Sequence, residues 1–288
     1  MKIVTHNGHF HTDELMAVAT LLRKFPDAEV VRSRDEAAIN SADIAVDVGQ
    51  IYAPDKMRFD HHQPEGAGVR ENGIPYASFG LIWGKYGAEI SGGDEEAKII
   101  EERLVLPVDA EDNGIHFSTP LLPGTSEYSI GDFVESFALG SKRLDDYEKG
   151  FFQVLPILKQ LLMREITNAE QTVSDWREVE KIYNDSEEKK IIVLPSSMHW
   201  KKVLIPTEAL YVISFRQDNK WGVRAVPKEF HSYEVKKPFP QEWAGLSGEA
   251  LAKVSGVSDA QFCHNGRWLA NAGSKEGAVK LAEKALNQ

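Results

Sequence analysis

Near its amino end, the sequence joins an apolar strand, a histidine-rich loop and a helix within one stretch, KIVTHNGHFHTDELMAVATLL (residues 2–22). Residues 2–5 predict a strand, and residues 13–22 predict a helix whose first turn is acidic, as helix amino ends favour. Three histidines and two carboxylates fall within residues 6–14. In an open parallel sheet, such a loop lies at the carboxyl edge, where ligands bind. The stretch therefore predicts an α/β fold with a ligand site at that edge.

The alternation of strand and helix continues beyond this stretch. Further strands are predicted at 29–32, 44–48 and 57–60. Helical segments are predicted at 35–40, 76–86 and 95–106. Strands that alternate with helices favour a mostly parallel sheet with right-handed crossovers, covered by the helices.

The composition of the chain changes near residue 183. Before it, residues 130–138 and 142–183 have apolar side chains at helical spacing, with Pro156 as an expected kink or break. After it come strands at 191–194, 210–216 and 221–226, the last two joined by a hairpin turn at 217–220, then helices at 248–254 and 275–285 and a short strand around Phe262. We therefore predict an α/β protein with a mostly parallel-sheet domain at 1–183, which includes a helical linker region. A smaller mixed α+β domain at 184–288 follows, with a cleft between the two.

The composition is that of a globular protein, with 42% hydrophobic and 27% charged residues among 288. The single cysteine, Cys263, excludes an intrachain disulfide and a CxxC zinc site, and a reducing compartment, the cytoplasm, is the simplest interpretation. The sequence contains no apolar run near the roughly 20 residues that span a bilayer, so no membrane association is expected.

The net charge of −11 argues against a protein that coats nucleic acid through bulk positive charge. The charge is uneven: residues 1–180 contain 17 basic and 32 acidic residues, and residues 181–288 contain 16 and 12. The first part is therefore −15 and the second +4. This asymmetry suggests that an acidic part holds cations while a mildly basic part faces an anionic substrate, although an uneven solvated surface would have the same signature.

Three further clusters resemble the histidine-rich loop in chemistry. Asp47 ends an apolar strand, Asp60-His61-His62 follows a short strand, and an acidic cluster at 109–113 follows an apolar run. Each has a structural alternative when taken alone, such as capping of the Gly49 turn by Asp47. Because all four clusters lie at predicted strand ends or loops of one α/β domain, and because imidazole and carboxylate bind Mn, Fe or Zn ions, together they predict a metal site.

Asp60-His61-His62 resembles the signature of the DHH phosphoesterase superfamily, whose four acid and histidine motifs occur in this order. The combination of 5–14, Asp47-Val48-Gly49 and 109–114 is similar to the melanocyte-proliferating-gene family, whose characterised relatives are described as RNA exonucleases. The resemblance extends to 263–267, and so covers nearly the whole chain. The first motif of the superfamily usually carries two aspartates, where this sequence has His11 and Asp13, so the ligand type differs.

The resemblance implies a site for two divalent ions. One ion would take His6, His11 and Asp47, and the other would take Asp13, Asp47, His61 and Asp109, with Asp47 bridging. His62 would act in catalysis as a donor to the phosphate or the leaving oxygen, and Asp60 would orient a neighbouring histidine. Because the site mixes imidazole and carboxylate, we expect Mn²⁺ first and Mg²⁺ second.

Substrate contacts are expected from the basic part of the chain. The candidates are Arg224 on a strand and His264, Asn265 and Arg267 near the end, because guanidinium groups bind phosphate with two parallel hydrogen bonds. The prediction is a two-metal phosphodiesterase, an exonuclease that hydrolyses single-stranded RNA or DNA ends. The alternatives are a phosphoesterase for small molecules such as pyrophosphate and a metal-dependent binding module without turnover. The oligomeric state, strand polarity and exact substrate stay open.

Overall fold

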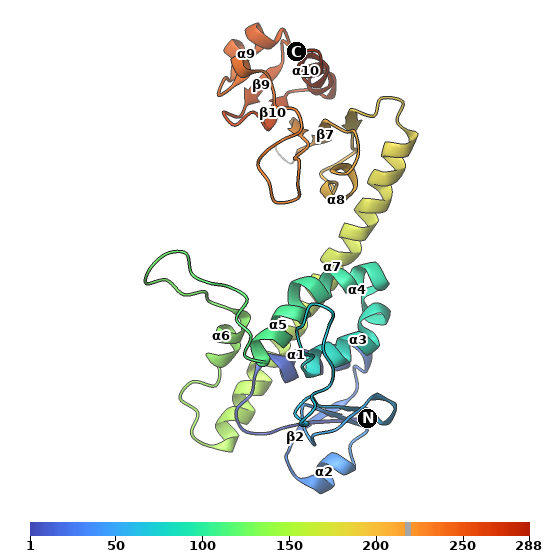
Figure 1. Ribbon diagram of the computed structural model, residues 1–288, viewed down its shortest axis with the longest axis vertical. Helices are drawn as coiled ribbons and strands as arrows, with labels where there is room; N and C mark the ends of the chain where they lie inside the picture. The colour runs from blue at the N-terminus through green and yellow to red at the C-terminus, as the bar shows by residue number, and fades with distance from the viewer. Residues whose placement is uncertain (217–219) are drawn as a thin grey trace. The chain divides into compact units, whose positions relative to one another are not determined.

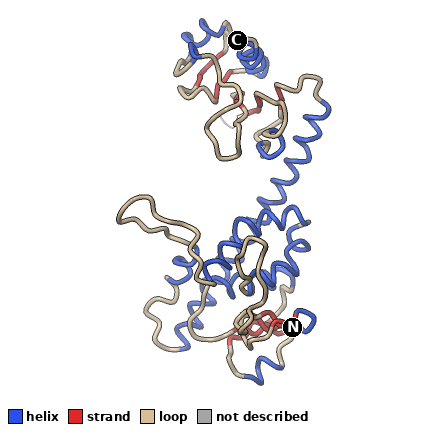
Figure 2. The backbone as a smooth tube through the Cα atoms, viewed as in Figure 1, coloured by secondary structure: helices blue, strands red, loops and turns tan. Residues whose placement is uncertain are grey.

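The computed structural model describes residues 1–216 and 220–288 and has the predicted α/β class (Figure 1). The chain divides into two compact units, Met1–Glu170 and Gln171–Gln288. Each unit contains its own five-stranded sheet, and Figure 2 shows the strands of each gathered within the unit. The boundary between the units falls within the long helix α7 (Leu144–Asp185), whereas the sequence suggested a boundary near residue 183, at the end of that helix.

The sheet of the first unit is mostly parallel, as predicted. Its strands are β1 (Lys2–Thr5), β2 (Glu29–Arg32), β3 (Ile44–Val46), β4 (Tyr52–Ala53) and β5 (Arg58–Phe59). They lie in the order β2-β1-β3-β5-β4, and every pair is parallel except the edge pair of β4 with β5. The strands are two to four residues long, and the chain turns into a loop directly after each parallel strand. The carboxyl ends of β1, β3 and β5 therefore meet at one edge.

Helices cover this sheet and complete its core. They are α1 (Thr12–Lys24), α2 (Glu36–Asn40), α3 (Ser78–Ser91), α4 (Asp94–Ile100), α5 (Leu106–Asp112), α6 (Ile130–Glu135) and α7, with short turns η1 (Pro54–Lys56) and η2 (Glu101–Val105). The core contains the fully buried side chains of Phe10, Leu15, Phe79 and Phe151. Because α1 is buried along most of its length, the loop before it is fixed at the edge of the sheet.

Two prolines interrupt helices less than the sequence suggests. The acidic cluster at 109–113 was expected at a strand end or loop, but Asp109 lies on α5. The π-helical turn η2 continues directly into this helix, and Pro107, the second residue of α5, lies just after the junction. Helix α7 likewise continues through Pro156, because Phe151, Leu155 and Leu158 on both sides of it are buried in the same core.

The second unit has a mixed sheet. Its strands are β6 (Ile191–Val193), β7 (Tyr211–Phe215), β8 (Trp221–Ala225), β9 (Ala260–Cys263) and β10 (Leu269–Ala272), in the order β6-β7-β8-β10-β9. Only β6 and β7 are parallel, and the other neighbours are antiparallel. Strand β10 was not predicted, because its sequence LANA lacks the bulky β-formers that mark strands. The predicted turn at 217–220 includes 217–219, which lie outside the described residues.

Short helices pack on the second sheet. They are α8 (Lys201–Leu204), η3 (Gln241–Trp243), α9 (Gly248–Ser255) and α10 (Lys275–Leu286). The core of this unit is centred on Tyr211, Phe239 and Trp243, which are fully buried. Among the described residues, no helix has both the length and the apolar composition that crossing a bilayer requires, and this includes the 42-residue α7.

Two glycines of α3 provide a test of how tightly its amino end packs on α5. A Cβ added to the buried Gly80 would overlap Asp109 Oδ2 and lie 2.6 Å from Arg70 Nη2, whereas a Cβ at the exposed Gly84 meets nothing within 4 Å. Gly80→Ala should therefore lower the free energy of unfolding by about 1–3 kcal/mol. The control Gly84→Ala should raise it by about 0.5–1 kcal/mol, because alanine is the better helix former. Urea denaturation measures both, and equal changes would contradict this packing.

Candidate metal centre

The first three histidine and acid clusters converge at the carboxyl edge of the parallel sheet. His6 is the first residue after β1, and Asp47 is the first residue after β3. His61 is the second residue after β5. A cavity of about 540 Å³ opens there. Its lining includes six of the predicted site residues: His6, His11, Asp13, Asp47, Asp60 and His62. The strand order therefore brings together side chains that are far apart in the sequence.

Asp47 lies at the centre of this cluster and is almost fully buried. Its backbone has a φ of +53°, a left-handed conformation that aspartate tolerates better than most residues. Its N–H continues the sheet by donating to the Phe59 carbonyl at 2.9 Å. Asp47 Oδ2 lies 3.3 Å from His6 Nε2, and Oδ1 lies 3.4 Å from both His61 Nε2 and His62 Nδ1. The two oxygens of one carboxylate thus face different histidines.

Asp60 fixes the geometry of the Asp-His-His motif. Its Oδ2 accepts the Gln50 N–H at 2.6 Å, which holds the turn that follows Asp47. Its Oδ1 contacts His62 Nδ1 at 2.8 Å and accepts the His62 backbone N–H at 3.0 Å. Burial would raise the pKa of Asp60, but these hydrogen bonds lower it below its ordinary value. The half-exposed His62 is therefore held in one orientation, with its ring at the cavity wall.

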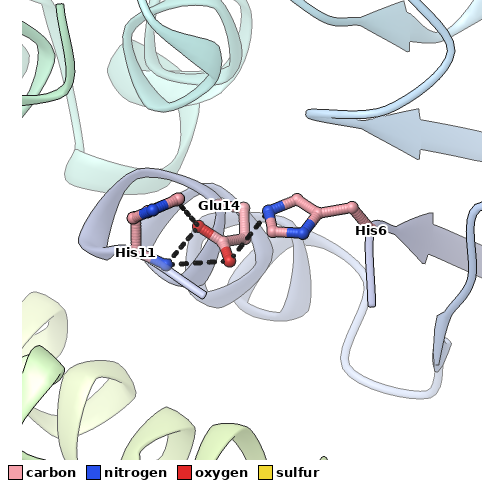
Figure 3. A group of neighbouring side chains, drawn as sticks. All are labelled: His6, His11 and Glu14. Atoms are coloured by element: carbon pink, nitrogen blue, oxygen red, sulfur yellow. Dashed lines mark hydrogen bonds and ion pairs between the residues drawn. The ribbon is translucent and has the colours of Figure 1, made fainter. Parts of the chain in front are cut away.

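Glu14 joins the two histidines of the first loop, as Figure 3 shows. This buried carboxylate accepts the His11 backbone N–H with both oxygens, at 3.0 and 2.9 Å. Its Oε1 lies 3.1 Å from His6 Nε2, and its Oε2 lies 4.0 Å from His11 Nδ1. Sequence reasoning did not select Glu14, although its position three residues after His11 is the spacing of a capping box at the start of α1.

His9, which sequence reasoning left out of the ligand set, supports His11 from the other side. His9 Nδ1 lies 3.2 Å from His11 Nε2, and His9 Nε2 lies 3.0 Å from Glu135 Oε2 on α6. A carboxylate behind a histidine typically fixes the ring orientation of a metal ligand. Glu135 has no local signal in the sequence, because its contact with His9 joins residues 126 positions apart.

The amino end of α3 stabilises two of the buried carboxylates. Asp13 accepts the Ser78 and Phe79 N–H groups at 3.0 and 2.7 Å, and Asp109 Oδ1 accepts the Gly80 N–H at 3.0 Å. Three N–H groups that have no partner within the helix are thus satisfied by side chains from α1 and α5. The positive partial charge of the helix amino end also favours these negative groups.

Asp109 and Asp112 lie three residues apart on α5 but face different partners. Asp109 Oδ2 is 2.7 Å from Arg70 Nη2, whereas Asp112 Oδ2 is 3.1 Å from His61 Nε2. Among the described residues, three groups of ligand atoms lie close enough to hold an ion: His6, His11 and Glu14; Asp47, His61 and His62; and Asp13, His61 and Asp112. Asp109 belongs to none of them. Both aspartates stood in the same predicted cluster, and positions three apart share one face of a helix, so their different partners follow from the tertiary contacts with Arg70 and His61.

The pKa values show how strongly these groups interact. Burial would lower the pKa of His6, but the Asp47 and Glu14 carboxylates raise it to about 10. Asp112 and Asp47 likewise outweigh burial at His61 and raise its pKa to about 9. The pKa of His62 rises to about 10, because it is hydrogen-bonded to Asp47 and Asp60. These raised pKa values favour the protonated form of His6, His61 and His62 at neutral pH.

The pKa values of the buried carboxylates shift in opposite directions. Burial would raise the pKa of Asp47, but the neighbouring imidazoles of His6, His61 and His62 hold it well below its ordinary value. The pKa of Asp13 is instead well above its ordinary value, because of burial and of repulsion from Asp112, Asp47 and Asp109. Burial also raises the pKa of Asp109 to about 6, despite Arg70. The centre thus crowds more negative groups than it can hold ionised without cations.

The donor set fits divalent ions. His61 Nε2 is buried, lies between Asp112 and Asp47, and has no well-aligned hydrogen bond there. A ring nitrogen in this position can serve as a metal ligand once it loses its proton. Mixed imidazole and carboxylate groups suit Mn, Fe and Zn.

The residues predicted to contact substrate lie in the second unit. Arg224 is half-buried on β8, and the pKa of its guanidinium is lowered by burial and by the nearby Arg216. His264, Asn265 and Arg267 occupy the turn between β9 and β10. Arg267 donates from Nη1 to the Phe239 carbonyl at 3.2 Å, so part of its hydrogen-bonding capacity is used within the unit. Their contact with a substrate stays a prediction.

Comparison with known proteins identifies relatives of the chain. The family described as "Uncharacterised protein family (UPF0160)" matches residues 2–286. A human protein named MYG1 exonuclease is 30% identical over 332 residues, which cover 100% of this chain and 86% of the human one. A rat MYG1 exonuclease is 30% identical over 329 residues, covering 100% and 85%. A MYG1 protein of Dictyostelium discoideum is 29% identical over 324 residues, covering 100% and 97%. The similarity therefore extends over both units.

Metal binding should release protons. His6 and His61, the proposed ligands with raised pKa values of about 10 and about 9, are protonated near neutral pH, whereas a metal-bound imidazole has given up that proton. Mn²⁺ binding should therefore liberate protons at neutral pH, and the apparent affinity should strengthen as pH rises towards these values. Isothermal titration calorimetry in buffers of different ionisation enthalpy measures the release. A binding heat that is the same in every buffer would contradict the assigned ligands.

Asp109 and Asp112 should respond differently to the same substitution. Asp109→Asn weakens the contacts with Arg70 and the amino end of α3, and should lower the free energy of unfolding by about 1–3 kcal/mol. Asp112→Asn should leave stability nearly unchanged but weaken Mn²⁺ binding, since Asp112 faces His61. Urea unfolding and Mn²⁺ titration of both variants measure the two effects. The reverse pattern would assign the metal to Asp109.

Proposed function

The chain belongs to the MYG1 exonuclease family (UPF0160), as its resemblance to the melanocyte-proliferating-gene family predicted, and from this we propose that it is a divalent-metal-dependent phosphodiesterase that removes nucleotides from single-stranded RNA or DNA ends. Relatives named MYG1 exonuclease support hydrolysis of nucleic acid. The cluster of imidazole and carboxylate groups at the sheet edge supports the use of metal ions.

The observation that carries the proposal is the arrangement around Asp47. Its Oδ2 faces His6, which belongs to the group with His11 and Glu14, and its Oδ1 faces His61. A carboxylate whose two oxygens face two ligand groups is suited to bridge two ions. We therefore propose one ion at His6, His11 and Asp47, with Glu14 beside it. The second would bind at Asp13, Asp47 and His61, with Asp112 favoured over Asp109 by its contact with His61.

Divalent ions in such a site supply Lewis-acid polarisation of a phosphodiester and a water of lowered pKa. Mn²⁺ is favoured by the mixed donor set, and Mg²⁺ is second. The remaining work falls to the protein. His62, which is fixed by Asp60 and lines the cavity, would donate a proton or hydrogen bond to the leaving oxygen. Asp47 and Asp60 both raise the pKa of His62, and the contact with Asp60, which is not a proposed ligand, would favour the protonated ring that a donor requires.

The second unit would supply contacts that position the substrate. Arg224, His264, Asn265 and Arg267 stay the proposed phosphate contacts, and their basic unit complements the acidic metal centre. The excess of basic over acidic groups after residue 180 is only four, which favours a short or terminal segment of nucleic acid over a long duplex.

The direct test is the activity of ligand variants. Asp47→Asn and His61→Ala should lower Mn²⁺-dependent release of mononucleotides by more than the roughly 100-fold that loss of a group supporting a ligand costs. The exposed Asp55 offers a matched control, since Asp55→Asn should keep wild-type turnover. A labelled single-stranded oligonucleotide and separation of the products measure the release.

Three results would redirect the assignment. Wild-type turnover in Asp47→Asn or His61→Ala would show that the centre is not the active site. Rapid hydrolysis of pyrophosphate or a cyclic dinucleotide, with no cleavage of the oligonucleotide, would indicate a small-molecule phosphoesterase. Metal binding without hydrolysis of any phosphoester in a broad panel would indicate a binding module.

A further inference from the structure

The segment 114–129, between α5 and α6, projects from the first unit as a long loop (Figures 1 and 2). The structure describes all of it, and it contains no helix or strand. Four large apolar side chains along it are exposed to solvent: Phe117 at 56%, Leu121 at 95%, Leu122 at 68% and Tyr128 at 71%. Exposed apolar groups gathered on one short segment indicate a binding surface. We call this segment the apolar hairpin.

Hydrogen bonds brace the apolar hairpin at its tip and midway along it. At the tip, the Thr125 N–H and hydroxyl donate to the Leu122 carbonyl at 3.3 and 2.7 Å. Midway, the Ser118 hydroxyl donates to Glu127. The pair of Ser118 and Glu127 brings their sequence neighbours Phe117 and Tyr128 to corresponding levels of the two arms. The two aromatic side chains are therefore presented by one braced element.

Both ends of the apolar hairpin join the rim of the metal centre. Glu111 and Asp112, just before it, and Asp132 and Glu135, just after it, line the same cavity as His62. At the base, the Ser129 hydroxyl donates to Glu111 Oε1 at 2.9 Å and ties the two ends together. A molecule bound near the base of the apolar hairpin would therefore lie next to the metal centre.

The charge of this region restricts what it binds. Residues 114–129 contain no lysine or arginine, and their charged side chain is Glu127. The base of the apolar hairpin adds Glu111, Asp132 and Glu135. Apart from the imidazole of His116, residues 114–129 offer phosphate no basic partner, so this segment is suited to contact the uncharged, flat or apolar part of a ligand. In a nucleic acid that surface is the base, which stacks on aromatic side chains without regard to sequence.

We propose that Phe117 and Tyr128 stack on the bases of a single-stranded substrate whose terminal phosphodiester lies in the metal centre. This inference rests on the proposed function, and it assigns recognition of the bases to the apolar hairpin. The tip residues Leu121 and Leu122 extend the same apolar surface. Binding through stacking is tolerant of sequence, which suits an enzyme that removes successive nucleotides.

Binding and cleavage of two oligonucleotides test the proposal. One is a short single strand with ordinary bases, and the other has abasic nucleotides at its ends. Phe117→Ala and Tyr128→Ala should each raise Kd and KM for the ordinary strand roughly 10-fold, a loss typical of one stacked base, and should change neither for the abasic strand. Tyr128→Phe, which keeps the ring, should retain wild-type values. Leu139→Ala, an exposed truncation outside the apolar hairpin, is the matched control.

The readouts separate failure of this inference from failure of the proposed function. Fluorescence anisotropy with Ca²⁺ in place of Mn²⁺ measures binding without turnover. Weakened binding of the ordinary strand by the alanine variants supports the inference even if nothing is hydrolysed. An unchanged Kd in the double variant, which combines Phe117→Ala and Tyr128→Ala, overturns the inference. No binding of the ordinary strand by the wild type also overturns it. A wild-type dimer that becomes a monomer in the double variant, measured by light scattering, would also overturn it, because the apolar hairpin would then cover a second copy of the chain.

Discussion

The burial of one carboxylate, Asp47, among three imidazoles is the interaction on which the rest of this centre depends. An ionised carboxylate taken out of water is costly unless charged or hydrogen-bonding groups surround it. Here β1 and β5, on either side of β3, deliver His6 and the pair His61 and His62 to it. The left-handed backbone at Asp47 turns the chain at the point where the three strands end. The strand order brings the histidines to Asp47, and their contacts with Asp47 offset the cost of burying its charge.

This arrangement explains part of the acidity of the first unit. Its negative groups are balanced locally: Asp13 and Asp109 by the amino end of α3, Asp109 also by Arg70, and Asp47 by histidines. The balance is incomplete, because Asp13 is still crowded by Asp47, Asp109 and Asp112. Divalent ions would remove this repulsion and displace the histidine protons. The net charge of −11 therefore says less about nucleic-acid binding than the location of the charges does.

Much of this molecule follows from local sequence patterns. Alternating strands and helices predict the parallel sheet, and strand ends that carry His6, Asp47 and His61 predict where the cluster forms. Sequence reasoning fails where long-range contacts decide. The sequence analysis placed the cluster at 109–113 at a strand end or loop, and only tertiary contacts direct Asp109 to Arg70 and Asp112 to His61. Strand β10 forms from small residues only because β8 and β9 flank it. The contact of Glu135 with His9 depends on the tertiary fold alone.

Anomalous diffraction from crystals grown with Mn²⁺ tests the central claim most directly, because it counts the ions and locates their ligands. We expect two peaks roughly 4 Å apart on either side of Asp47. One should lie at His6 and His11, and the other at Asp13 and His61 with Asp112. A single peak, or peaks that Asp47 does not contact, would contradict a bridging carboxylate and with it the proposed two-metal centre.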